Sequence, residues 1–132
     1  MESHFTPYIS GEKQELIIAE NQNFLAIIEE RPLALGHCVV LPKMATDSWN
    51  DLSDQSLSEL MIFAKKISHA IKEAIPCKKV GLAAIGLQVR HAHLHLVPIS
   101  SADDLNFTRI KLQPKLEDLI KIAEQIKAKI IG

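Results

Sequence analysis

Apolar residues recur at helical spacing in two parts of the chain. Ser53 is a suitable N-cap for the first part, a predicted helix over 54–74, and Pro76 follows its end. The apolar positions of this helix are Leu57, Leu60, Met61, Ala64, Ile67 and Ile71. Pro114 lies near the first turn of a second predicted helix, whose apolar positions are Leu116, Leu119, Ile120, Ala123, Ile126 and Ile130. Intervals of three and four residues predict that each helix buries one face.

Outside these helices, short runs rich in branched apolar residues predict strands. The expected strands are 15–20, 24–29, 37–41, 79–85 and 89–99, with a short helical turn at 5–9. The first two flank the polar turn 21–23, which predicts a hairpin. Strands joined by hairpins around one long helix predict an α+β fold with a mainly antiparallel sheet of about five strands. The length of 132 residues fits one domain, 1–132.

Composition narrows the class of protein. A hydrophobic content of 47% is enough for a packed core. The 15 basic and 16 acidic residues give no electrostatic reason to expect binding to nucleic acid or to a membrane. Cys38 and Cys77 do not form a disulfide framework, which favours a reducing compartment. No apolar run approaches the ~18 residues of a membrane span, and no signal peptide is recognised, so we expect a soluble cytoplasmic protein.

The most informative motif is the alternating run His91-Ala92-His93-Leu94-His95. In a strand, the three histidines would line one face, and Ala92, Leu94 and Leu96 would pack under the long helix. Three imidazoles on one face are a poor choice for packing alone. Two chemical interpretations remain open: a metal site such as zinc, or nucleophilic attack on phosphorus. The second needs one imidazole nitrogen free and the other held as N–H, with donors for the phosphoryl oxygens and the leaving group.

Two stretches together resemble a known family. His91 to Val97 matches the pattern His-φ-His-φ-His-φ-φ of the histidine-triad (HIT) family, in which φ is hydrophobic. Upstream, 24–32 (Phe-Leu-Ala-Ile-Ile-Glu-Glu-Arg-Pro) and Gly36-His37 with Pro42-Lys43 resemble a second landmark of that family, most closely of its Hint-like branch. The resemblance covers about residues 8–100. It implies a HIT-like fold with one long central helix and a C-terminal helix.

The resemblance also assigns roles to individual residues. It implies that His93 is the nucleophile, that His91 orients it chiefly through its backbone carbonyl, and that His95 donates to the phosphate or leaving group. It places His37 beside them as a fourth imidazole and gives Glu29 the grip on the ribose hydroxyls. Two apolar residues are candidates for the base pocket, although core packing would explain each equally well: these are Phe24 and Ile27.

The implied function is a hydrolase or transferase acting at a nucleotide α-phosphate through a covalent nucleotidyl-histidine. It would be of the nucleoside phosphoramidase or dinucleoside polyphosphate hydrolase type, without a cofactor or protein-bound metal. The implied ligand is a purine nucleotide or nucleotide conjugate, and the implied assembly is a homodimer that uses the long helix and an edge strand. Two alternatives stay open: a nucleotide-binding module with little catalysis, and a zinc-binding protein that uses the histidine cluster.

The chain departs from the family pattern at several positions. Leu87 stands where many members have a phosphate-binding Gln, and Gln88, one position later, is the candidate to replace that substrate contact. Strand alternation would point Gln88 away from the face of His91 unless a bulge intervenes. The Asn that usually precedes this segment is missing. Ser3-His4-Phe5-Thr6 replaces the Cys-x-x-Cys zinc motif of some members, so no zinc site is expected there. Arg90 is expected at the surface or in a dimer contact.

Overall fold

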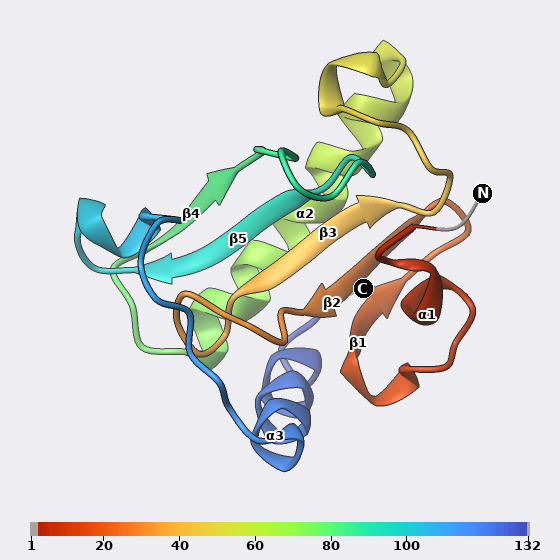
Figure 1. The fold of residues 1–132 in the computed structure, drawn as a ribbon. Coiled ribbons are helices and arrows are strands. Elements are labelled where there is room, and N and C mark those ends of the chain that lie inside the picture. The colour runs from red at the N-terminus through yellow and green to blue at the C-terminus, as the bar shows by residue number, and fades with distance from the viewer. Residues whose placement is uncertain (1–2, 132) are drawn as a thin grey trace.

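An antiparallel sheet with the long helix α2 (Asp54–Ala74) against one face forms the framework of the molecule (Figure 1). The computed structural model describes residues 3–131, so the predicted domain boundaries at positions 1 and 132 lie outside the described part. The strands are β1 (Ile17–Glu20), β2 (Phe24–Ile28), β3 (Cys38–Pro42), β4 (Lys79–Ala83) and β5 (Leu94–Ile99), in the order β1-β2-β3-β5-β4. The helices are α1 (Thr6–Ile9), α2 (Asp54–Ala74) and α3 (Leu116–Lys127). The predicted α+β class and five-stranded antiparallel sheet are confirmed.

The β1–β2 hairpin forms at the polar turn that the sequence indicates. The side chain of Asn21 accepts hydrogen bonds from the backbone N–H groups of Asn23 (2.9 Å) and Phe24 (2.8 Å). An Asn side chain that bonds the backbone two residues later stabilises a tight turn. The turn sets the register in which Glu20 faces Leu25, and β2 then pairs along its whole length with β3.

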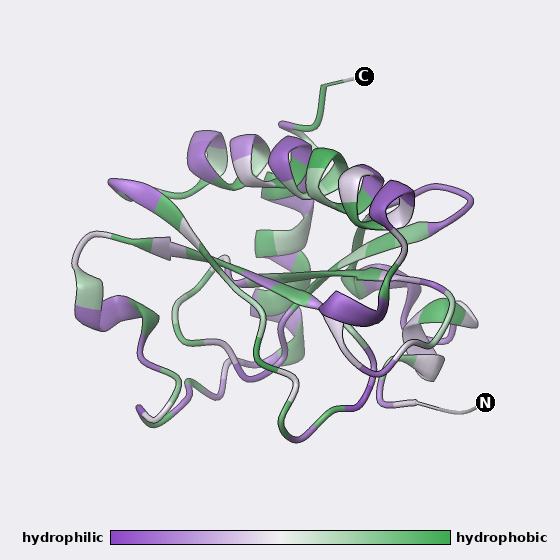
Figure 2. Ribbon diagram, turned by 90° about the horizontal axis from the view of Figure 1, so that it is seen from above, coloured by the Kyte–Doolittle hydropathy of each residue, from purple (hydrophilic) through white to green (hydrophobic). Residues whose placement is uncertain are grey.

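Helix α2 covers the sheet on the face opposite the N-terminal segment, as the view from above shows (Figure 2). It begins as predicted, because the Ser53 hydroxyl accepts a hydrogen bond from the backbone N–H of Ser56 (3.1 Å), and it ends two residues before Pro76. Its buried residues are Leu60, Phe63, Ala64, Ile67, Ala70 and Ile71. Leu94 and Leu96 of β5 belong to the same apolar core, as predicted. Among residues 3–131, no helix has the length and apolar character needed to cross a lipid bilayer.

The predicted strand over 89–99 is too long at its start, because β5 begins only at Leu94. The ring Nε2 of His91 donates a hydrogen bond to the backbone carbonyl oxygen of Pro42 at the end of β3 (2.7 Å). The backbone N–H of Ala92 bonds the carbonyl of Thr46 (2.6 Å), outside the sheet. Pairing with β3 therefore starts at Leu94, opposite Val40. Strand alternation cannot place His91 and His93 on one face, because neither residue is in the strand, and Ala92 lies outside the core under α2.

Candidate active site

Three candidate side chains, Glu29, His93 and His95, line a cavity on the sheet face opposite α2, and a fourth, His37, contacts His95 beside it. His95 lies in β5 and His93 directly precedes it, His37 directly precedes β3, and Glu29 directly follows β2. The cavity has a volume of about 360 Å³, and we call it the histidine cavity. It is lined by His4, Phe5, Glu29, Val39, Ile85, Gly86, Leu87, Gln88, Val89, His93, His95, Phe107, Thr108 and Lys111. A larger hollow, of about 670 Å³, lies beside α2 and the β1–β2 turn and contains none of these four side chains.

The turn before His37 requires a glycine at position 36. Its φ of +101° is in the region that residues with a side chain rarely adopt, and a Cβ there would lie 2.8 Å from Cγ1 of Ile75. The turn brings the backbone carbonyl of His37 to the N–H of Glu29, at 2.9 Å. The end of β2 and the start of β3 therefore hold Glu29 and His37 side by side.

His93 has a defined proton position. Its Nδ1 lies 2.7 Å from the backbone carbonyl oxygen of His91. A carbonyl can only accept, so Nδ1 carries the hydrogen and Nε2 keeps a free lone pair. Burial is the main reason why the pKa of His93 is lowered from its usual value, and only 7% of the residue is exposed. The ring is therefore neutral at neutral pH, which is the form that a nucleophile requires.

Hydrogen bonds also fix which ring nitrogens of His37 and His95 carry the hydrogen. The backbone N–H of Leu33 donates to Nδ1 of His37 (3.0 Å), so the proton of neutral His37 is on Nε2. That nitrogen lies 2.9 Å from Nδ1 of His95, which must accept, and the proton of His95 is therefore on Nε2. Burial lowers the pKa of His37 to about 3 and that of His95 to about 4, with neighbouring imidazoles and Lys111 contributing. His95 thus offers a neutral N–H donor.

His91 differs from the other members of the run, because its ring is a buried structural group. Only 1% of it is exposed. Its Nε2 donates to the Pro42 carbonyl at 2.7 Å, so its Nδ1 accepts from the Ser3 hydroxyl at 2.8 Å. Phe5 packs edge-on against both His91 and His93, with ring centroids 5.3 and 5.2 Å apart. The part of His91 that reaches the nucleophile is its carbonyl, and the N-terminal segment covers the rings.

Glu29 lies beside the two linked imidazoles, with a carboxylate oxygen within 4.8 Å of the facing nitrogens of His37 and His95. Burial raises its pKa, although the backbone N–H groups of Arg31 (3.5 Å) and Glu30 (2.8 Å) donate to the carboxylate. A carboxylate in this position can accept hydroxyl hydrogens from a ligand in the cavity.

The residues present do not fit a zinc ion. Glu29, His37 and His95 have suitable spacing, but Nε2 of His37 carries the proton that the hydrogen bond from Leu33 imposes. A metal ligand must offer a lone pair at that atom. The ring of His91 is engaged by a hydroxyl and a carbonyl, and neither group supplies the thiolate or imidazole that zinc sites favour.

Two of the expected binding residues do not line the histidine cavity. Phe24 does not line the histidine cavity, because its ring packs against Phe63 of α2 at a centroid distance of 5.9 Å. Its position on β2 points it to the core. Ile27 is 2% exposed and pairs with Val39, which does line the cavity, so Ile27 lies beside a cavity residue on the same sheet face without lining the cavity itself. Both residues belong to the hydrophobic core, which was the alternative expectation for each.

Gln88 lines the histidine cavity, as a residue that replaces the missing phosphate contact would. The interruption of the strand that this position requires is present, because the chain leaves β4 at Ala83 and turns at Gly86, with φ of +67°. Leu87 lines the same cavity and is 87% exposed. Arg90 is exposed and pairs with Asp47 at 2.9 Å, as expected for a surface residue.

The segment that follows β5 also contributes to the cavity, and no sequence motif predicts it. The ring of Phe107 packs against His95 and His37, at centroid distances of 4.8 and 6.2 Å. Thr108 and Lys111 line the cavity beside it. No spacing motif links these residues to the histidine run. The only available signal was an aromatic and a basic residue within a polar loop.

Known proteins share both this fold and this sequence pattern. An uncharacterized HIT-like protein of Borreliella burgdorferi is 28% identical over 134 residues, which cover 96% of each chain. The adenosine 5'-monophosphoramidase of Schizosaccharomyces pombe is 25% identical over 130 residues, again 96% of each. The solved structure of a Hit-like protein involved in cell-cycle regulation, from Bartonella henselae, has the same fold, with a TM-score of 0.82 and 22% identity; 97% of this chain and 96% of that one are covered. The family model of the HIT domain matches residues 10–102. The chain therefore belongs to the histidine-triad (HIT) family.

Proposed function

We propose that this protein is a hydrolase or transferase that acts at the α-phosphate of a purine nucleotide or nucleotide conjugate through a covalent nucleotidyl-histidine at His93. The observation that carries the proposal is the 2.7 Å hydrogen bond between Nδ1 of His93 and the carbonyl of His91. It leaves Nε2 as a bare nucleophile beside a cavity large enough for part of a nucleotide.

The first step forms one bond and breaks another. The lone pair of His93 Nε2 attacks the α-phosphorus, and the bond from phosphorus to the leaving group breaks, with the leaving group taking the electron pair. The modified ring is positively charged, and the His91 carbonyl stabilises it by accepting from Nδ1–H. His95 Nε2–H is the adjacent donor for a phosphoryl oxygen or the leaving group, since the two rings are 4.8 Å apart.

The second step regenerates the enzyme. Water attacks the phosphorus and loses a proton to the solvent, the phosphorus–nitrogen bond breaks, and its electron pair returns to Nε2, which releases a nucleoside monophosphate. Another acceptor in place of water would make the protein a transferase. Glu29 would hold the ribose hydroxyls during both steps. The name of the related S. pombe protein, a monophosphoramidase, supports chemistry at a nucleotide phosphorus.

Steady-state kinetics with adenosine 5'-phosphoramidate test this proposal. We expect turnover by the natural chain and a loss of at least about a thousandfold for His93→Ala, as when a nucleophile is removed. His69→Ala, at an exposed position of α2, is the matched control and should keep full activity. Turnover by the His93 variant at the natural rate would refute the proposal.

A nucleotide-binding module with little catalysis is the second candidate, favoured by Leu87. This exposed apolar side chain lines the cavity where many family members place a phosphate-binding Gln, so one donor to the transition state would be missing. Calorimetry with AMP separates the two candidates. Binding of AMP by a chain that turns over no phosphoramidate and no dinucleoside polyphosphate would favour the module.

We also propose a homodimer located in the cytoplasm. Support for the dimer comes from exposed apolar side chains on α2 and on the edge strand β4: Met61, Ile62 and Leu82. Support for a reducing compartment comes from Cys38 and Cys77, which are both free thiols. Sedimentation velocity should give the mass of two chains, and Ile62→Asp should shift it to the mass of one.

A further inference from the structure

We propose that Lys111 binds the leaving group, and that this chain therefore prefers nucleotides whose leaving group is a phosphate chain over those that release an amine. This inference rests on the proposed function and assigns a specificity-determining residue to the same site. It comes from a part of the chain that carries none of the histidine motif.

The ammonium group of Lys111 is held in place at the histidine cavity. Its Nζ donates to the backbone carbonyls of Phe107 (2.5 Å) and Arg109 (3.3 Å). An ammonium has three hydrogens, so one donor remains for a ligand. Within residues 3–131, no carboxylate forms an ion pair with Lys111. A half-buried cation that faces a cavity without an acidic partner favours an anionic ligand.

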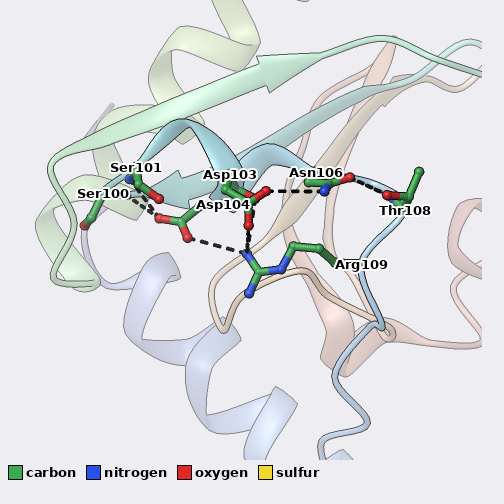
Figure 3. A network of polar contacts seen from close by, with 7 residues as sticks. All are labelled: Ser100, Ser101, Asp103, Asp104, Asn106, Thr108 and Arg109. Carbon is green, nitrogen blue, oxygen red and sulfur yellow. Dashed lines mark hydrogen bonds and ion pairs between the residues drawn. The ribbon is translucent and has the colours of Figure 1, made fainter.

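The loop that carries Lys111 is itself fixed, as Figure 3 shows. The carboxylate of Asp104 accepts from the backbone N–H groups of Ser100 (2.8 Å) and Ser101 (2.9 Å) at the end of β5. Its other oxygen lies 3.5 Å from the guanidinium of Arg109, which also donates to the Asp103 carbonyl (3.2 Å). These contacts set the backbone of Arg109, whose carbonyl in turn holds Lys111. The cation is thus placed before any ligand arrives, which lowers the entropy cost of binding.

Lys111 lies on the His95 side of the nucleophile. The backbone carbonyl of Phe107 accepts from its ammonium, and the ring of Phe107 packs against His95 at a centroid distance of 4.8 Å. The rings of His95 and His93 are also 4.8 Å apart, and all these residues line the same cavity. A group attached to a phosphorus at His93 can therefore extend past His95 to the ammonium.

The two kinds of leaving group make different demands on the site. An amine must gain a proton as its bond to phosphorus breaks, whereas a phosphate chain leaves as an anion and needs its developing charge balanced. A neutral His95 donates a hydrogen bond but releases its proton poorly. A fixed ammonium supplies the positive charge that the anion requires. The site is therefore better equipped for departure of a phosphate chain.

Kinetics with two substrates test the assignment. We would measure kcat/KM for diadenosine tetraphosphate and for adenosine 5'-phosphoramidate, in the natural chain and in Lys111→Met. A hydrogen bond to a charged group supports an expected loss of about 10- to 100-fold for the tetraphosphate and about twofold or less for the phosphoramidate. Lys111→Arg should recover part of the loss. Lys115→Met, at an exposed position before α3, removes a lysine outside the cavity and should change neither value.

The ratio of the two kcat/KM values is independent of the fraction of protein that is correctly folded, so a lower yield of folded protein cannot imitate the predicted result. Equal losses for both substrates would overturn the assignment, because Lys111 would then serve the α-phosphate or the nucleoside. No loss for the tetraphosphate would also overturn it. Failure of the proposed function is distinguishable, since the natural chain would then turn over neither substrate.

Discussion

At the scale of single residues, two backbone groups decide what the histidines can do. The carbonyl of His91 fixes the proton of His93, and the N–H of Leu33 fixes the proton of His37 and, through it, that of His95. The motif allowed His93, His95 and His37 to be selected as candidates. It could not show which nitrogen of each ring carries hydrogen. Every residue has a backbone N–H or carbonyl, so its partner is known only once the chain is folded.

Replacing His37 tests whether its hydrogen bond fixes the tautomer of His95. His37→Leu removes the donor to His95 and leaves the Leu33 N–H without a partner, which should cost about 1–3 kcal/mol of stability. We expect kcat/KM to fall at least about tenfold, because His95 is then free to adopt the wrong tautomer. His37→Gln can still donate through its amide and should retain more activity. Thermal unfolding and steady-state kinetics measure the two effects, and equal activity in both variants would contradict the tautomer argument.

At the scale of elements, the predicted helices and strands depend on local pattern and are mostly present. Helix α2 is confirmed over 54–74, because helical spacing and an N-cap agree there. The start of β5 could not be predicted. An alternating run fits a strand wherever it has a partner, but the ring of His91 occupies the Pro42 carbonyl and ends the pairing. Residues 14–16 form a 3₁₀ turn, so the first strand also begins late, at Ile17.

The turn between β2 and β3 gives a prediction for Gly36. An alanine would have to adopt φ near +101° with its Cβ 2.8 Å from Ile75, so we expect a loss of about 1–3 kcal/mol and reduced activity through displaced His37. Urea denaturation measures the stability.

Gly11→Ala is the matched control for that substitution. Gly11 also has a positive φ, +89°, but a Cβ there would meet only Oε1 of Gln14 at an ordinary 3.5 Å. It should therefore cost less stability than Gly36→Ala and leave activity unchanged. A larger cost at Gly11 would show that the contact with Ile75 does not matter.

At the scale of the whole molecule, the site is completed by two segments outside the sheet, one before β1 and one after β5. The sheet supplies His37, His95 and Glu29, which the sequence landmarks identified. The cover comes from Phe5, next to the N-terminus, and from Phe107, in the loop after β5. Contacts between positions so far apart leave no periodic trace in a single sequence. This is why the imidazoles were predictable and their surroundings were not.

Burial of neutral histidines predicts that the whole protein loses stability in acid. The folded pKa values of His37 and His95 are about 3 and 4, below the usual 6.5, so the unfolded chain binds more protons between about pH 4 and 6.5. Stability is then present above pH 6.5 and falls as pH drops through this window. The raised pKa of Glu29 has the opposite effect, since this group adds stability as pH falls, but it is one group against two histidines.

Urea denaturation at pH 7 and pH 5 measures this effect. We expect a lower free energy of unfolding at pH 5, and a smaller difference between the two pH values for His37→Gln, which has one buried imidazole fewer. Equal stability of the natural chain at both pH values would contradict the assignment of neutral, buried imidazoles.

The most direct test of the covalent mechanism is the intact mass of the protein, measured after rapid mixing with a slowly hydrolysed adenosine phosphoramidate and quenching at alkaline pH. The account predicts a mass increase of one adenylyl group, mapped by peptide analysis to His93 and missing from His93→Ala. A chain that turns over the substrate without forming the adduct, or that carries it on another residue, would contradict the account.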